Sequence, residues 1–131
     1  MTGLDTNVLV RFFAQDDSLQ SPKADEFMGS LTAENPGWVA MATILELVWV
    51  LGSKNRFDQN TIAKTVDQLL SREDILVEQA EVVRSALRLF RKGKADFADC
   101  LIVLSARVAG CSRTVTFDRR AARDAGMELL E

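Results

Sequence analysis

Histidine is absent from this 131-residue chain. Without an imidazole the chain cannot form a Ser-His-Asp or Cys-His catalytic group, a His-ligated zinc site or a histidine proton shuttle. The two cysteines, Cys100 and Cys111, lie eleven positions apart without a CxxC spacing, which excludes a zinc knuckle and a thioredoxin-type redox pair. Acid, base and metal chemistry is therefore left to the carboxylates.

The sequence also lacks the marks of export and of nucleotide-binding loops. It has no signal-peptide pattern, no GxxxxGK[ST] and no GxGxxG, and its longest nearly apolar stretch, residues 39–51, is too short to span a bilayer. We expect a soluble, cytoplasmic protein with reduced thiols and no membrane partner. Hydrophobic residues make up 47% of the chain, which excludes intrinsic disorder, and the length predicts one domain over residues 1–131.

Charge is unevenly distributed along the chain. Residues 1–83 contain 6 Lys or Arg and 13 Asp or Glu, whereas residues 84–131 contain 10 and 6. The basic half predicts a surface that can bind a polyanion. A solvated helix face explains the same basic residues equally well.

Short apolar runs alternate with helix-length segments throughout. Strands are predicted at 1–5, 38–40, 74–77, 114–116 and 127–130, and helices at 6–13, 19–33, 42–52, 58–71, 80–92, 96–109 and 118–125. Strands of three to five residues separated by helices are typical of a parallel sheet covered on both faces. The predicted fold class is α/β, a three-layer α/β/α sandwich with a short-stranded parallel central sheet.

Two acids stand out in the first half of the chain. Asp5 directly follows the first strand, where an open α/β fold places ligands, although an Asp there is also a common helix N-cap. Glu46 is the only ionisable residue between Glu34 and Lys54. Thr43 and Glu46 match a capping box, but the apolar neighbours of Glu46 favour a carboxylate held near a core and compensated by a cation.

Three more acids begin helices in the second half. Asp96 and Asp99 share one side of a helix start, and we assign Asp96 as the cap because the apolar run 101–104 follows Asp99. Asp118 ends a strand that leads into a helix, a position that a cap also explains. If the strands are ordered as in a doubly wound fold, Asp5, Glu46, Asp99 and Asp118 converge at one sheet edge. Such a pocket suits Mg²⁺ or Mn²⁺ rather than zinc.

At these residues the sequence resembles the PIN-domain nucleases, and within them the VapC-type toxins of bacterial toxin-antitoxin pairs. The resemblance covers the whole chain and is carried by Leu4-Asp5-Thr6-Asn7-Val8-Leu9-Val10, by residues 43–51 with Glu46 and Trp49, by residues 96–102 and by Thr116-Phe117-Asp118. It implies that Asp5, Glu46, Asp99 and Asp118 are the catalytic acids. It also implies that Thr6, Asn7 and Thr116 line their pocket.

The resemblance further implies a Mg²⁺- or Mn²⁺-dependent endoribonuclease that hydrolyses RNA with a metal-bound water. Asp5 and Asp99 would hold the metal, Glu46 would orient the water or join a second metal, and Asp118 would complete the cage. The implied partners are RNA and a small antitoxin. Two alternatives stay open: a housekeeping PIN nuclease, and a catalytically silent PIN-like module that binds RNA or protein.

The segment 42–52 is apolar on two faces. Ile44, Leu47, Val48 and Leu51 form one face, which suffices to cover a sheet. Leu45 and Trp49 form the other, which packs on helices of the same chain or meets a partner helix. Because small soluble domains commonly cover such a patch with a twofold contact, we expect a homodimer, which the resemblance also implies.

Overall fold

The computed structural model describes residues 1–131, and the chain divides into two compact units, residues 1–80 and residues 81–131. Each unit is described by itself below. No helix in either unit combines the length and the hydropathy that a membrane span requires. The single domain predicted from the chain length stays a prediction.

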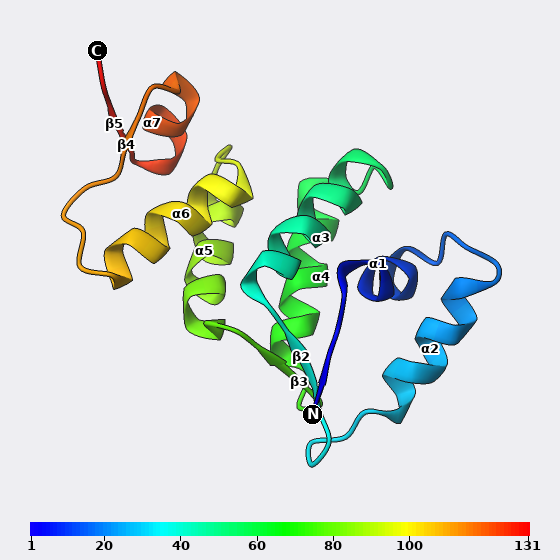
Figure 1. Ribbon diagram of the computed structural model, residues 1–131. Coiled ribbons are helices and arrows are strands. Elements are labelled where there is room, and N and C mark those ends of the chain that lie inside the picture. The colour runs from blue at the N-terminus through cyan, green and yellow to red at the C-terminus, as the bar shows by residue number, and fades with distance from the viewer. The chain divides into compact units, whose positions relative to one another are not determined.

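The first unit is a parallel three-stranded sheet with four helices (Figure 1). Its elements are β1 (Thr2–Gly3), α1 (Thr6–Ala14), α2 (Gln20–Ser30), β2 (Gly37–Val39), α3 (Met41–Ser53), α4 (Gln59–Ser71) and β3 (Ile75–Val77). The strand order is β1-β2-β3, with Thr2 opposite Gly37 and Gly37 opposite Ile75. Because the strands are parallel, α1 and α3 both begin at the edge where the strands end, as Figure 1 shows.

Apolar periodicity and helix caps explain why these segments fold as they do. Along α3, the side chains of Ile44, Leu47 and Leu51 are fully buried, and they recur at the three- and four-residue spacing of one helix face. Asp58 caps α4, because its side chain accepts a hydrogen bond of 2.8 Å from the backbone amide of Thr61. In the middle strand, Gly37 leaves no room for a side chain, since an added Cβ would lie 3.0 Å from a methyl group of Ile75.

The second unit holds three helices and a parallel pair of strands. Its elements are α5 (Ala80–Lys92), α6 (Phe97–Val108), β4 (Val115–Thr116), α7 (Arg119–Ala125) and β5 (Glu128–Leu129). The rings of Phe90 and Phe97 meet edge to face at 5.6 Å and join α5 to the start of α6. Gly126 ends α7 with φ of 80°, a left-handed backbone that favours glycine.

All twelve elements predicted from the sequence are present, and the α/β class with parallel strands is confirmed. The first unit contains a sheet of three strands, and the second unit contains a pair of strands. One detail differs. The helix expected over 19–33 ends at Ser30, because Leu31 leaves the helical backbone with ψ of 147°.

Candidate functional site

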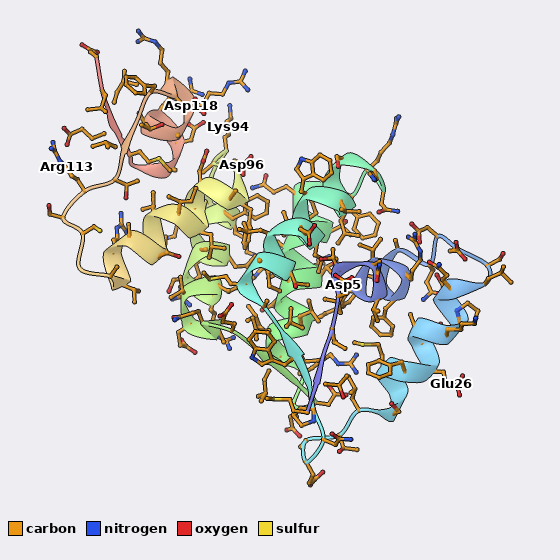
Figure 2. The ribbon with its side chains drawn as sticks, in the orientation of Figure 1. Asp5, Glu26, Lys94, Asp96, Arg113 and Asp118 are labelled. Carbon is orange, nitrogen blue, oxygen red and sulfur yellow. The ribbon has the colours of Figure 1, made fainter.

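Asp5 lies between the end of β1 and the start of α1, as predicted (Figure 2). Its carboxylate caps α1 by accepting a hydrogen bond of 2.8 Å from the backbone amide of Thr6. This bond uses one carboxylate oxygen, and the residue remains exposed to solvent. The cap and the functional interpretation of Asp5 are therefore compatible.

The structure excludes the capping-box alternative for Glu46 and corrects its expected burial. The N-cap of α3 is Ala40, so Thr43 lies inside the helix and a capping box with Glu46 does not form. Glu46 is exposed rather than held near the core, because its side chain projects about 100° around α3 from the buried Leu47. Its Oε1 accepts a hydrogen bond of 2.7 Å from the hydroxyl of Thr6, a largely buried residue of α1.

Asp5 and Glu46 thus belong to one site in the first unit. Both line a pocket of about 450 Å³, together with Thr6, Asn7, Val10, Arg11, Asp16, Val50, Lys54 and Asn55. Thr6 joins the two acids, since its backbone amide binds Asp5 and its hydroxyl binds Glu46. Thr6 and Asn7 line the same pocket as Asp5 and Glu46.

Sequence reasoning missed four further residues of this pocket, which are Arg11, Asp16, Lys54 and Asn55. Arg11 pairs with Asp16, with Nη1 at 3.1 Å from both carboxylate oxygens, and the amide Nδ2 of Asn55 donates to Asp16 at 2.9 Å. The hydrogen bond from Asn55 is the main reason that the pKa of Asp16 is lowered, and the charge of Arg11 adds to it against the opposing effect of burial. Asp16 and Asn55 are 39 residues apart, so no local pattern points to the pair.

The second unit gathers three carboxylates at its helix starts. Asp96 caps α6, with 2.7 Å to the backbone amide of Ala98, which confirms its predicted role. Asp118 caps α7, and its own amide donates to the hydroxyl of Thr116. Asp99 lies in the first turn of α6, and its pKa is raised by partial burial and then by the charges of Asp96 and Asp118. Figure 2 shows Asp96 and Asp118 in the same part of this unit.

The two cysteines differ in reactivity. Cys100 is buried next to Asp99, and burial, followed by the negative charges of Asp99 and Asp96, raises its pKa to about 11. At neutral pH this thiol stays protonated and is neither a nucleophile nor a soft-metal ligand. Cys111 is an exposed free thiol.

Several of the basic residues in the second half have acidic or polar neighbours. Arg113 pairs with Glu128 at 2.7 Å, Arg123 pairs with Asp124, and Arg84 lies 3.5 Å from Glu81. The buried side of α5 is apolar, so its arginines lie on a solvated face. The interpretation as a solvated helix face therefore accounts for part of the basic charge.

The candidate donor set consists of carboxylates and hydroxyl groups, which fits a hard cation. The structure brings Asp5 and Glu46 together in the first unit, and it places Asp99 close to Asp96 and Asp118 in the second. Neither unit by itself assembles three acidic or cysteine side chains in a geometry that holds a metal ion. Convergence of the four predicted acids stays a prediction.

A family model described as the PIN domain matches residues 4–126, so the chain belongs to the PIN domain family. It is also 29% identical over 118 residues to the VapC ribonuclease of Aquifex aeolicus (strain VF5), an alignment that covers 89% of this chain and 87% of that protein. The family match runs through both units and includes the four predicted acids. The seven helices and parallel strands agree with the three-layer α/β/α fold predicted from the sequence.

Proposed function

We propose that this protein is a metal-dependent endoribonuclease, and that residues 1–131 act as one PIN domain with a single active site. The observation that carries the proposal is the hydrogen-bonded group of Asp5, Thr6 and Glu46 in one pocket of a PIN-family chain. In this proposal Asp99 and Asp118 of the second unit complete the site. The similarity to a VapC ribonuclease supports RNA as the substrate.

The proposed cation is Mg²⁺ or Mn²⁺, held by Asp5 and Asp99. When bound, such an ion supplies Lewis-acid polarisation of a phosphate and lowers the pKa of a coordinated water. The carboxylate of Glu46 orients the attacking water and accepts its proton, and the hydroxyl of Thr6 holds that carboxylate in place. Asp118 adds a fourth carboxylate to the proposed site.

The test of this proposal is cleavage of single-stranded RNA with and without EDTA. We expect cleavage to stop in EDTA and to return with added Mg²⁺ or Mn²⁺. The products should carry no cyclic phosphate, because water and not the 2′-hydroxyl is the nucleophile. Asp5→Asn and Asp99→Asn should each lower kcat by about 10²-fold or more, since each removes a charge from the metal ligands.

The matched control is Asp58→Asn. Asn caps a helix about as well as Asp, so Asp5→Asn and Asp58→Asn both preserve a cap, and only the first changes the pocket. If Asp5→Asn and Asp99→Asn are as active as the parent, these acids serve only to cap a helix or to place a negative charge in its first turn. RNA binding without cleavage in any metal would favour the silent binding module instead.

We also propose that the protein is the toxin of a toxin-antitoxin pair, located in the cytoplasm. The proposed partner is a small antitoxin that offers a basic side chain to the carboxylates. Expression of this chain should arrest growth of a bacterial host, and co-expression of a small adjacent reading frame should restore growth. Growth arrest that no adjacent reading frame relieves, or no arrest at all, would favour a housekeeping nuclease.

Homodimer formation belongs to the same proposal. Of the two alternatives for the face of Leu45 and Trp49, the first unit supports a partner, because the side chain of Trp49 is 64% exposed, while Ile44, Leu47 and Leu51 on the other face of α3 are buried. An exposed tryptophan on an apolar helix supports a contact with a second copy. Light scattering should give twice the 14.5 kDa chain mass, and a monomer at all concentrations would contradict the proposal.

A further inference from the structure

The pocket in the first unit extends well beyond its two candidate catalytic acids. Asp5 and Glu46 line one end, whereas Arg11, Asp16, Lys54 and Asn55 line the other. A volume of about 450 Å³ lies within the range of small-ligand sites and exceeds what one metal ion and its waters fill. The second end is therefore available to another part of the substrate.

Asn55 carries an unused hydrogen-bond acceptor at this end. Its Nδ2 donates to Oδ2 of Asp16 at 2.9 Å, and this bond fixes which side of the amide is the oxygen. The oxygen, Oδ1, is buried and receives no hydrogen bond from the chain. A buried acceptor without a donor is unfavourable, so a donor that reaches Oδ1 would be bound favourably.

Lys54 carries an available positive charge next to Asn55. Its side chain is exposed, and it forms no ion pair with a carboxylate of the first unit. Arg11, the other cation of the pocket, is already paired with Asp16 and also donates to Gln20 at 2.8 Å. Lys54 is thus the cation of this pocket that can reach an incoming anion.

We propose that Lys54 and Asn55 form a nucleotide subsite, which rests on the proposed ribonuclease function. Lys54 binds the phosphate next to the cleaved phosphodiester, and Oδ1 of Asn55 accepts a hydrogen bond from the 2′-hydroxyl of the same nucleotide. The pair of Arg11 and Asp16 holds the Asn55 amide in this orientation. Asn55 is therefore a specificity residue that distinguishes RNA from DNA.

The choice of the 2′-hydroxyl follows from the spacing of the two side chains. Lys54 and Asn55 line the same pocket, so we place their contacts on groups that lie close together on one nucleotide. Every ribonucleotide has a hydroxyl donor beside its phosphate, whereas amino-group donors occur only on some bases. The 2′-hydroxyl is also the group by which proteins tell RNA from DNA.

The experiment measures binding of a labelled single-stranded RNA and of its all-deoxy counterpart by fluorescence anisotropy, in Ca²⁺, with the strand checked for integrity afterwards. The parent should bind the RNA about fivefold more tightly than the DNA, the effect of one hydrogen bond. Asn55→Ala should remove this preference without weakening DNA binding. Lys54→Ala should weaken both strands about tenfold and lower the salt dependence by about one phosphate contact.

The matched controls are Asn60→Ala and Lys64→Ala, which change exposed residues of α4 outside the pocket. They should leave binding unchanged. The comparison of RNA with DNA on the parent needs no substitution, so it stands even if a variant unfolds. Three results would overturn the subsite. The first is equal binding of RNA and DNA by the parent, and the second is no detectable binding. The third is that the pocket variants and the control variants change binding equally.

This result is separate from the test of catalysis. If the parent cleaves RNA and both pocket variants bind RNA and DNA like the parent, the proposed nuclease function stands and the proposed subsite is refuted. If the parent shows the expected binding pattern but does not cleave RNA in Mg²⁺ or Mn²⁺, the proposed subsite stands and the proposed nuclease function is refuted.

Discussion

The hydrogen bond from Thr6 to Glu46 is the contact that we expect to control the candidate active site most directly. Thr6→Val removes the hydroxyl but keeps a β-branched side chain of similar size at a position that is 8% exposed. The lost bond is 2.7 Å long and reaches a carboxylate. Hydrogen bonds to charged groups contribute about 1.5–3 kcal/mol.

The stability cost of Thr6→Val should lie below that range. Glu46 is exposed, so water replaces the hydroxyl and no buried charge is left without a partner. We expect a loss of about 1 kcal/mol in the free energy of unfolding, measured by urea denaturation. We also expect kcat to fall about tenfold with little change in KM, because the Glu46 carboxylate loses its fixed orientation.

A double-mutant cycle with Glu46→Gln separates positioning from general destabilisation. If Thr6 acts through Glu46, Thr6→Val should have little further effect on kcat in the Glu46→Gln background. The control is Thr65→Val, at an equally buried threonine of α4 whose hydroxyl donates only to a backbone carbonyl of its own helix. Independent, additive effects of Thr6→Val and Glu46→Gln on kcat would refute the reasoning.

Two further predictions concern stability and thiol chemistry. The pKa of Asp74 is lowered mainly by its hydrogen bonds from Arg72 at 2.8 Å, so the pair stabilises the fold above the unfolded pKa near 3.8 and loses this effect as pH falls below it. Asp74→Asn should therefore cost about 1 kcal/mol in urea denaturation at pH 7 and progressively less as the pH falls below 3.8, and a cost that does not change with pH would contradict the assignment. Iodoacetamide should label the exposed Cys111 in the folded protein. Cys100 is buried and its pKa is raised to about 11, so it should be labelled only after unfolding. Labelling of both cysteines at equal rates would show that Cys100 is accessible.

The order and type of the elements follow from local patterns that are visible in the sequence. Helix lengths, the caps at Asp58 and Asp96, and the helix end at Gly126 depend on residues within one turn of each boundary. Strand bounds were predicted less well, because strands of two or three residues are defined by pairing with distant strands.

The capping box shows where a local motif misleads. Thr43 and Glu46 have the right spacing, but α3 begins earlier, at Met41, with Ala40 as its N-cap. Glu46 therefore lies in the second turn of α3, where its side chain cannot take part in a cap of the helix start. Its partner is Thr6, which is 40 residues away.

The sequence by itself determined the α/β class, the helix caps and the set of carboxylates available for chemistry, because periodicity, capping preference and composition act over short distances along the chain. The tertiary structure alone decided which of these groups meet. Thr6 reaches Glu46 because α1 packs against α3, and Asp16 reaches Asn55 because the segments that follow those two helices border the same pocket. Such contacts join residues 39 or 40 positions apart, and their geometry depends on how the buried faces of the helices pack rather than on any spacing in the sequence.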